Sequence, residues 1–461
     1  MKKKTIKAVS LVLAFLMIMP FTAFAADTAA KDYTILNPYE DVIWSGDGAW
    51  GAYKGNLHTH SFVSDAEVDY RDMILEYYNQ GYDFLAMTDH AVTGKEWNKK
   101  PTKLPLYLYQ DIIGNKTHWF TDEEYAQLQS GEYPVDGEAR GSGMVCVTGG
   151  NELNGLTISK DHVNGIFLPE GVGDNYLGFE NDYEGAVRIA DENGALSFIN
   201  HPGDWLNTNS DRANCGDPEK IPYFADILLR YDSCLGMEVF NEHNGTTGYD
   251  RDTWDNLLMA CLPYGKNVIG FSNGDTHFIR DVDSSYSVFM MEANDLDNIR
   301  KTMQSGAFFM VTRCIRKDTE KFGPAEDLDV RDTDKPIPMF SDISIDGHKI
   351  TVSFSNAYNL KWVANGSVIK SEDYQQSGDT VTYTLDLDTV EGAEDFLYVR
   401  AQLLGEGGIT LTQAFALDDG AEKPVYERDN SPLGILKRIV RQILGLRIFV
   451  LIDLIIKKIK G

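Results

Sequence analysis

The sequence predicts an α/β domain followed by a small all-β domain. As far as residue 330, short apolar runs alternate with amphipathic stretches, which indicates strands alternating with helices. Beyond residue 338, apolar and polar residues alternate with a period of two, which is typical of antiparallel strands. Residue types that bind metal ions come directly after several of the apolar runs, and this placement predicts where the chemistry lies.

The strands predicted in the first part, residues 26–330, are short and bounded by turn residues. They lie at residues 84–87, 144–147, 196–199, 237–240 and 268–271. Continuous apolar runs of this length are typical of strands buried on both faces in a parallel sheet.

Amphipathic stretches between these runs predict helices. They lie at residues 68–80, 183–192, 253–262 and 296–304, and several end at a glycine that suits a helix C-cap, namely Gly81, Gly194 and Gly306. The segment at residues 95–143 breaks the alternation and is longer than an ordinary connection, so we interpret it as a candidate lid over a site.

Six of the nine histidines follow or flank the apolar runs, together with acidic residues. Side chains two residues apart leave the same face of an extended segment, so His58 with His60, and Asp275 with His277, can each bind one ion. Imidazole suits zinc, iron and manganese, and carboxylates can bridge two ions. Each residue alone could be an ordinary turn residue, but the complete set favours a catalytic metal site. Its members are His58, His60, His90, Glu152, His162, His201, Asp275 and His277.

These segments resemble the polymerase and histidinol phosphatase (PHP) superfamily of metal-dependent phosphoesterases. The resemblance covers about residues 50–315 and is carried by Leu57-His58-Thr-His60, Thr88-Asp89-His90, Asn151-Glu152, Asn200-His201-Pro202 and Gly274-Asp275-Thr-His277. It implies a distorted, TIM-like (βα)7 PHP-type barrel of about seven parallel strands. It also implies two or three divalent transition-metal ions, zinc, manganese or iron, at the C-terminal strand ends.

The resemblance also implies a set of ligands for each ion. His58, His60, Glu152 and Asp275 would bind the first ion, and Glu152, His162 and His201 the second, with Glu152 bridging. Asp65, His90 and His277 would bind a third. Asp65 could instead be the N-cap of a helix that starts near residue 66, and Asp89 could orient an imidazole or cap a loop.

Three further segments look like the carbaryl-hydrolase-like branch of the superfamily, which extends the possible substrates to carbamates and amides. They are Gly236-Met-Glu238-Val-Phe-Asn, Thr253-Trp-Asp-Asn-Leu-Leu and Ser305-Gly306-Ala-Phe-Phe-Met-Val-Thr312-Arg313. Three hypotheses follow: a phosphoesterase acting on a small phosphorylated substrate, an amide or carbamate hydrolase, and a binding protein with a silent barrel. The complete ligand set favours an enzyme, and the phosphoesterase is our first hypothesis.

In the expected mechanism, the ions generate hydroxide at neutral pH and polarise the ester or amide oxygen. Arg280 and Arg313 are candidates to stabilise the developing anion, although either could be a surface residue. His243 could protonate the leaving group, or could be a loop histidine without that role.

The second part, residues 338–418, predicts a small β-sandwich with a role in packing or binding. Residues 343–346, 350–354, 381–385 and 396–401 alternate with a period of two. Residues 419–431 form a linker to the C-terminal segment.

The sequence patterns at the two ends of the chain predict where the protein is located in or outside the cell. Residues 1–25 have the basic start, the apolar middle and the small-x-small cleavage site of a secretory signal peptide, so we expect a secreted protein that begins at Ala26. Residues 432–461 are basic, with apolar residues at helical spacing, and predict an amphipathic helix on an anionic membrane surface. The alternative is a helix packed against the protein's own acidic body.

The net charge limits the kinds of binding partner that we expect, and the cysteine spacing indicates whether disulfides form. The formal net charge is −28, and it falls to −38 for residues 26–431 because both ends of the chain are basic. Such an acidic body disfavours nucleic acid as a bulk partner but allows a small phosphorylated substrate. The five cysteines show no disulfide spacing, and we expect Cys146 and Cys234 to be buried thiols; the oligomeric state stays open.

Overall fold

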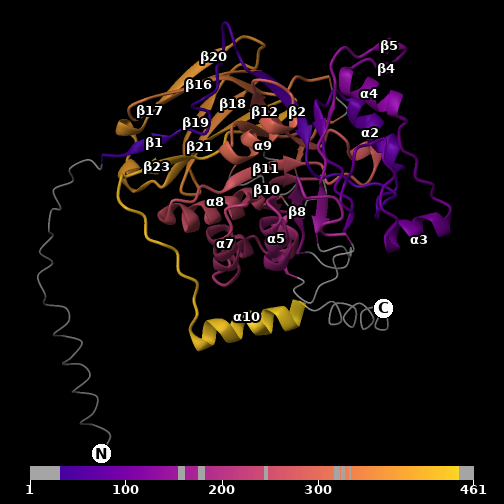
Figure 1. The fold of residues 1–461 in the computed structure, drawn as a ribbon. Helices are drawn as coiled ribbons and strands as arrows, with labels where there is room; N and C mark the ends of the chain where they lie inside the picture. The colour runs from indigo at the N-terminus through magenta and orange to yellow at the C-terminus, as the bar shows by residue number, and fades with distance from the viewer. Residues whose placement is uncertain are drawn as a thin grey trace, which may run out of the picture.

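The computed structural model describes residues 32–153, 161–174, 182–242, 248–315, 322, 328–331 and 334–445, and its mixed α/β architecture confirms the predicted fold class (Figure 1). The predicted signal peptide and residues 446–461 of the basic tail lie outside the described residues. None of the described helices is long and apolar enough to cross a membrane.

The first sheet begins as a parallel βαβ unit. Strand β2 (Gly51–Asn56) pairs in parallel with β3 (Phe84–Leu85), and β3 pairs in parallel with β6 (Val145–Cys146). Helix α2 (Tyr70–Asn79) connects β2 to β3 and buries Met73 and Ile74 against the core. This arrangement directs the chain that follows β2 and β3 toward the same edge of the sheet.

The candidate lid forms a small lobe of its own at one side of the molecule (Figure 1). It contains α3 (Pro105–Ile113), α4 (Asp122–Ser130), β4 (Pro134–Val135) and β5 (Glu138–Ala139). From α3, Gln110 donates hydrogen bonds to the backbone oxygens of Ser64 and Ala66, so the lobe contacts the loop that carries Asp65.

The second sheet contains five strands in the order β11-β10-β9-β8-β7. Strands β9 (Leu196–Ile199), β10 (Cys234–Asn241) and β11 (Ile269–Asn273) are parallel, whereas β8 (Val163–Ile166) is antiparallel to both β9 and β7 (Asn151–Leu153). An all-parallel barrel is therefore not what the structure shows. The cause is the nine-residue connection from β7 to β8, which is too short for the crossover that parallel neighbours require.

Helices connect the later strands of the second sheet: one lies between β8 and β9, two lie between β9 and β10, and one lies between β10 and β11. These helices are α5 (Tyr183–Glu192), α6 (Pro202–Leu206), α7 (Lys220–Arg230) and α8 (Asp250–Cys261). Two isolated parallel bridges link the two sheets, Thr59 with Thr276 and His90 with Glu152. The loops that carry these residues are thereby held against one another between the two sheets.

The C-terminal strands continue the first sheet instead of standing apart from it. From β2 the sheet runs through β12 (Ser285–Met291) and β13 (Phe308–Thr312), with α9 (Leu296–Ser305) between them, to β22 (Gly408–Leu411) and β21 (Tyr398–Gly405). At the outer end β23 (Phe415–Asp418) pairs with β1 (Thr34–Leu36). The α/β part and the β-rich part therefore share one sheet.

A second layer covers this extension. Strands β16 (Met339–Asp346), β17 (Lys349–Ser355) and β20 (Val381–Asp386) form a three-stranded sheet, and β18 (Asn359–Ala364) and β19 (Ser367–Asp373) extend the shared sheet beside β21. Phe340, Val352, Trp362 and Leu403 are buried in the same core as Phe309 of β13. Period-two alternation thus produces two sheets with their apolar sides facing inward.

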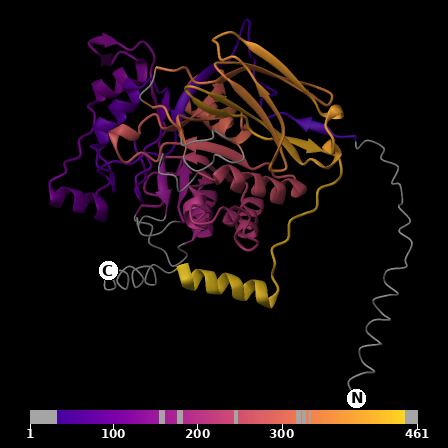
Figure 2. The same cartoon turned by 180° about the vertical axis from the view of Figure 1, so that it is seen from behind.

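The chain leaves this core through a strap, residues 419–431, that leads to helix α10 (Pro432–Gly445). Seen from both sides, α10 lies below α5 and α7, apart from the sheets (Figures 1 and 2). All five cysteines are free and buried, which confirms the expectation for Cys146 and Cys234.

Candidate metal centre

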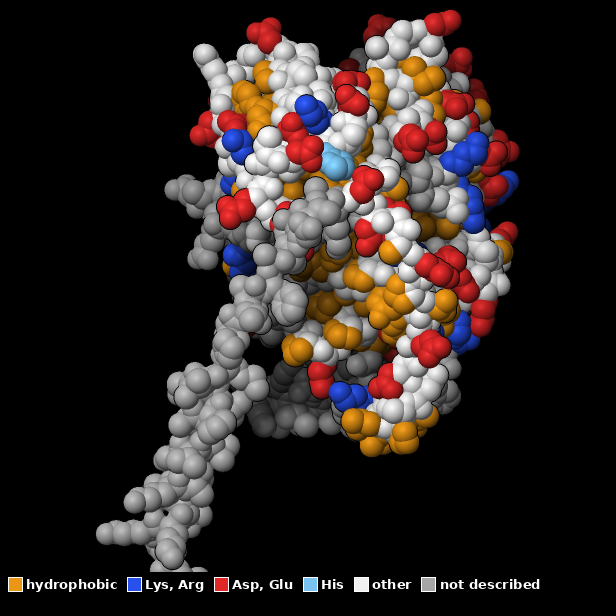
Figure 3. Space-filling model, turned by 90° about the vertical axis from the view of Figure 1, so that its left-hand side faces the viewer, with side chains coloured by type: hydrophobic (Ala, Val, Ile, Leu, Met, Phe, Trp, Pro, Cys, Tyr) orange, Lys and Arg blue, Asp and Glu red, His pale blue; other side chains and the backbone are white. Residues whose placement is uncertain are grey.

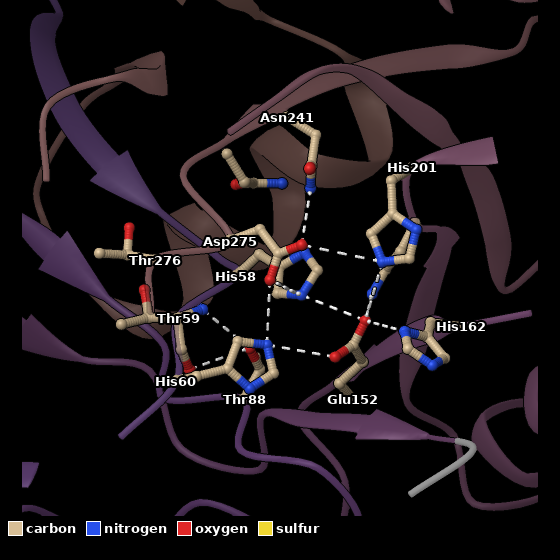
Figure 4. Close-up of polar contacts among 12 residues, drawn as sticks. His58, Thr59, His60, Thr88, Glu152, His162, His201, Asn241, Asp275 and Thr276 are labelled. Carbon is tan, nitrogen blue, oxygen red and sulfur yellow. Dashed lines mark hydrogen bonds and ion pairs between the residues drawn. The ribbon is translucent and has the colours of Figure 1, made fainter. Parts of the chain in front are cut away.

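The structure brings all nine predicted metal-binding side chains together in one cluster. Figure 4 shows several of them directed toward the carboxylates of Glu152 and Asp275. The nine are His58, His60, Asp65, His90, Glu152, His162, His201, Asp275 and His277, and close contacts connect each of them to another member.

Strand direction explains this convergence. His58, His90, His201 and Asp275 follow β2, β3, β9 and β11, which are parallel within their sheets. His162 precedes β8, but β8 runs in the opposite direction, so its start lies at the same edge as the end of β9. Because β8 runs antiparallel to β9, the residue before its N-terminal end, His162, reaches the same cluster as the residues that follow the parallel strands.

Glu152 lies at the centre of the cluster. Its Oε1 atom is 2.9 Å from His162 Nδ1, 3.2 Å from His58 Nε2 and 3.3 Å from His201 Nε2. Its Oε2 atom is 3.1 Å from both His60 Nε2 and His90 Nδ1. A carboxylate whose two oxygens face different imidazoles has the geometry of a group that bridges two ions.

Asp275 completes the first group of ligands. Its Oδ1 atom is 3.1 Å from His58 Nε2 and 3.1 Å from His60 Nε2. His58, His60, Glu152 and Asp275 therefore offer donor atoms to one point, and they are the four residues proposed for the first ion.

The other groups differ in part from the predicted sets. The structure groups His90 with Glu152 and His162, and it also groups His60 and His90 with Asp65. His201 lies on the opposite side of Glu152 from His60 (Figure 4). His277 and His90 lie 3.5 and 3.4 Å from Asp65, but the structure groups His277 with Glu242 and Asp275 and not with His90, so the predicted third set of Asp65, His90 and His277 does not form one group.

Glu242 is an additional acidic residue in the cluster that the sequence did not single out. It is grouped with Asp275 and His277, and its Oε1 atom is 3.7 Å from His277 Nδ1. Burial and the neighbouring carboxylate of Asp275 raise the pKa of Glu242 to about 8. The available signal was its place directly after the apolar run of β10.

Asp65 is a member of the cluster and not a helix cap. Helix α2 begins at Tyr70, and its N-cap residue is Asp69. Asp65 instead lies 3.4 Å from both His60 Nδ1 and His90 Nε2. The N-cap alternative is therefore wrong.

The buried polar atoms fit a site for metal ions. Seven side-chain atoms of the cluster are fully buried and make no hydrogen bond of acceptable geometry, which is costly unless another partner satisfies them. They are His58 Nε2, His60 Nε2, His90 Nδ1, His162 Nδ1, His162 Nε2, His201 Nδ1 and Asp275 Oδ1. Divalent ions would satisfy such lone pairs, and the mixed imidazole and carboxylate set suits zinc, manganese or iron.

The electrostatics of the cluster support the same interpretation. Burial opposes ionisation of Glu152, but His162, His90 and His58 outweigh it and hold the pKa of Glu152 well below its usual range. Burial lowers the pKa of His162, which favours the neutral imidazole that a metal ligand requires. Glu152 is therefore ionised at neutral pH, whereas the raised pKa of Glu242 favours its protonated form.

Three residues of the site have an unusual backbone conformation. His201, Asp275 and Glu242 have φ values of 26°, 44° and 45°, in the left-handed region that non-glycine residues rarely adopt. Each follows a strand of the second sheet. Strain of this kind is concentrated at functional sites, where the surrounding structure holds a side chain in a required direction.

Glu238 positions His58, a role that the sequence interpretation missed. Its Oε1 atom is 2.8 Å from His58 Nδ1, and its two oxygens also accept hydrogen bonds from the side chains of Asn241 and Asn273 and from the backbone of His201. Glu238 is fully buried on β10. A carboxylate at this nitrogen leaves the opposite one, Nε2, directed at the cluster.

Asp89 does not orient an imidazole directly. It accepts hydrogen bonds from the backbone and hydroxyl of Ser61 and from the hydroxyl of Ser64. Ser64 lies 3.3 Å from His60 Nδ1, so Asp89 acts on that histidine through the loop between them.

Neither predicted arginine is part of the cluster in the described structure. The side chain of Arg280 is 70% exposed and lies over the ring of Phe278. Arg313 forms an ion pair with Asp283 at 2.8 Å and donates to the backbone of Lys335 and Gly407. His243, the third predicted catalytic residue, lies outside the described residues.

Comparisons with known proteins find distant structural similarity. No protein-family model matches the sequence, and no curated protein matches it. A two-domain protein from Bacteroides vulgatus, described as containing a predicted PHP-like metal-dependent phosphoesterase, is 18% identical with a TM-score of 0.41, over 80% of this chain and 96% of that chain. The lesion-specific endonuclease PfuEndoQ from Pyrococcus furiosus is 14% identical with a TM-score of 0.30, over 56% of this chain and 58% of that one. These similarities are too low to assign a function, which rests on the site itself.

Proposed function

We propose that this protein is a secreted metal-dependent hydrolase of the PHP superfamily, and that it acts as a phosphoesterase on a small phosphorylated substrate. The observation that carries the proposal is the convergence of nine nitrogen and carboxylate donors around the buried Glu152. Their order along the chain is the order that the superfamily resemblance implies.

We assign residues to each ion as the superfamily resemblance implies. His58, His60, Glu152 and Asp275 would hold the first ion. Glu152, His162 and His201 would hold the second, and Asp65, His90 and His277 a third. When bound, divalent ions at this position supply Lewis acidity toward a phosphoryl oxygen and lower the pKa of a water molecule.

The protein's own residues supply orientation and charge. Glu238 fixes the ring of His58, and Asp89 fixes the loop that carries His60. The nearby hydroxyls of Ser61 and Ser64 donate to Asp89 and so hold its carboxylate against this loop.

A second candidate function is hydrolysis of an amide or carbamate by the same centre. It is favoured by the segment Gly236-Met-Glu238-Val-Phe-Asn, which resembles the carbaryl-hydrolase-like branch and which supplies the carboxylate beside His58. A silent binding protein is disfavoured because the donor set is complete.

Substrate size is constrained by charge. The body of the chain is strongly acidic, so a long polyanion such as nucleic acid would be repelled outside the centre, whereas one or two phosphate groups can be neutralised by bound ions. This favours a small phosphoester.

The test combines metal analysis with a substrate panel. We expect the purified mature protein to contain two or three transition-metal ions per chain and to hydrolyse at least one phosphomonoester or phosphodiester. Glu152→Gln should lose metal and activity while remaining folded, because an amide cannot bridge two cations as a carboxylate does. Glu391→Gln, at an exposed position, is the matched control and should retain both.

Two results would contradict this proposal. Full activity in the metal-free protein would exclude the metal-dependent mechanism. Hydrolysis of amides or carbamates, with no activity on any phosphoester, would replace the first candidate by the second.

A further inference from the structure

The tail helix α10 exposes an apolar face to solvent. Leu433, Ile435, Leu436, Ile439 and Val440 are between 43% and 63% exposed. Leu433, Leu436 and Val440 follow the i, i+3, i+7 spacing of one helical face, and Ile435 and Ile439 extend that face on one side. Such a contiguous apolar surface on a short helix indicates a site of interaction.

The opposite side of the helix faces the protein body. Gly434 is buried, and Arg438 one turn later is partly buried. Lys437, beside them, lies 3.2 Å from Glu219, the residue that precedes α7. The polar side of α10 therefore contacts the body, and the apolar face is not covered by it.

The start of α10 is attached to the body by the strap. Arg428 forms an ion pair with Glu184 of α5 at 2.6 Å and lies 3.4 Å from Asp226 of α7. Tyr426 donates a hydrogen bond to Asp226 at 2.9 Å. These contacts hold the helix at the side of the molecule where both ribbon views place it (Figure 2).

Charge identifies the kind of surface that this helix suits. Figure 3 shows acidic side chains over much of one face of the body, with apolar side chains gathered at its lower end, the height at which α10 lies in Figure 1. By sequence, residues 432–461 contain seven basic residues and one acidic residue, whereas residues 26–431 carry a net charge of −38. A helix with an apolar face and a basic remainder is complementary to anionic lipid.

We propose that α10 docks the protein on the surface of an anionic lipid bilayer. The apolar face enters the boundary between headgroups and acyl chains, and the net positive charge of residues 432–461 attracts the anionic headgroups. The strap keeps the acidic body on the side of α10 that faces away from the lipid, where repulsion from the membrane is weakest. This inference is independent of the proposed hydrolase activity.

The test is cosedimentation of the mature chain with phosphatidylcholine vesicles that contain or lack phosphatidylglycerol. We expect binding only to the vesicles with phosphatidylglycerol, and weaker binding at high salt. Leu436→Glu and Val440→Glu, each placing an acid on the apolar face, should lower the partition coefficient by about tenfold or more. Val425→Glu is the matched control, since Val425 is 87% exposed on the strap and its change alters net charge equally.

Metal content and circular dichroism should be unchanged in all three variants, because the substituted side chains lie on the surface of α10 or the strap, away from the metal cluster. Wild-type binding by Leu436→Glu and Val440→Glu would overturn the proposal, as would wild-type protein that stays in solution with every vesicle. If analytical ultracentrifugation instead shows a dimer that these two variants dissociate, the apolar face binds a second copy of the chain, and the membrane proposal is wrong.

Discussion

Glu238 illustrates how one buried side chain orients a histidine of the candidate metal centre. Its two oxygens receive four donors: the rings or side chains of His58, Asn241 and Asn273 and the backbone N–H of His201. A carboxylate can accept all four, because it has only acceptor sites. Its charge also raises the pKa of His58, together with Asp275 and against the effect of burial.

We expect Glu238→Gln to lower metal affinity by about 10- to 100-fold, the usual effect of removing an outer partner of a ligand. The amide of glutamine would direct an NH₂ group at residues that are themselves donors, so the ring of His58 would lose its orientation. The measurement is competition with a chromophoric chelator, which reports metal affinity without requiring turnover.

Glu391→Gln serves as control for this change, since it makes the same substitution at an exposed position. A chelator titration of Glu238→Gln that overlays the wild type would show that Glu238 has only a structural role. Thermal unfolding of the metal-free proteins separates a loss of affinity from a loss of fold.

At the same scale, the members of the donor cluster could be predicted from the sequence, whereas the residues that support them could not. His58 with His60, and Asp275 with His277, are recognisable because each pair is two residues apart. Glu238 is 180 residues from the histidine that it contacts, and the two belong to different sheets, so only the packing of one sheet against the other brings them together. Contacts of this kind are set by tertiary structure and leave no local pattern.

Among the elements, helices were predicted more accurately than strand directions. The predicted stretches at residues 183–192 and 296–304 correspond to α5 (Tyr183–Glu192) and α9 (Leu296–Ser305). Each has an aspartate N-cap whose side chain accepts from the helix backbone, so the boundary is encoded locally. Strands β7 and β8 were not predicted, and an apolar run by itself does not reveal whether its neighbour is parallel or antiparallel.

Helix α4 joins the lobe at residues 95–143 to α2 through one ion pair. Arg71 of α2 donates two hydrogen bonds to Glu124, at 2.8 and 2.9 Å. Glu124 also completes a capping box with Thr121 at the start of α4. The hydrogen bonds from Arg71 and the backbone of Thr121 lower the pKa of Glu124 from 4.5 to about 2.

We expect Glu124→Gln to lower the free energy of unfolding by about 1 kcal/mol at pH 7, a value that allows for screening of a partly exposed pair. Because the folded pKa is depressed, this contribution is present above pH 4.5 and is lost as the pH falls toward about 2. Urea unfolding of the wild type and Glu124→Gln from pH 7 to pH 2 should show that the difference between their free energies of unfolding becomes smaller as the pH falls from 4.5 toward about 2. A difference that is independent of pH would contradict the assignment to this ion pair.

In the molecule as a whole, the two parts are joined by a shared sheet and by a buried ion pair. Arg400 of β21 contacts Asp255 of α8 through Nε at 2.8 Å and Nη2 at 2.9 Å, and Tyr398 donates to the same carboxylate at 2.6 Å. All three side chains are buried. The change of sequence pattern near residue 330 precedes β16, which begins at Met339, but sheet pairing between β13 and β22 could not be anticipated from that pattern.

We expect Asp255→Asn to destabilise the whole chain by about 3–5 kcal/mol, because it removes one charge of a buried ion pair with the guanidinium of Arg400. Urea unfolding followed by tryptophan fluorescence measures the loss, and both parts should unfold in one transition. Asp47→Asn, at an exposed position, is the control. Two separate transitions, with only the later part of the chain affected, would show that the parts are independent.

The pairing of β1 with β23 has a consequence for when the protein can fold. Thr34, near the beginning of the folded chain, pairs with Asp418 at its end, so the outer edge of the shared sheet forms only after nearly the whole polypeptide has been synthesised. Pairings of such long range are slow, and synthesis from the N-terminus delays this one further. The nascent chain therefore stays incompletely folded for as long as its last strands are missing. This delay would suit the proposed secretion, because a polypeptide passes through a narrow export channel only while it is unfolded.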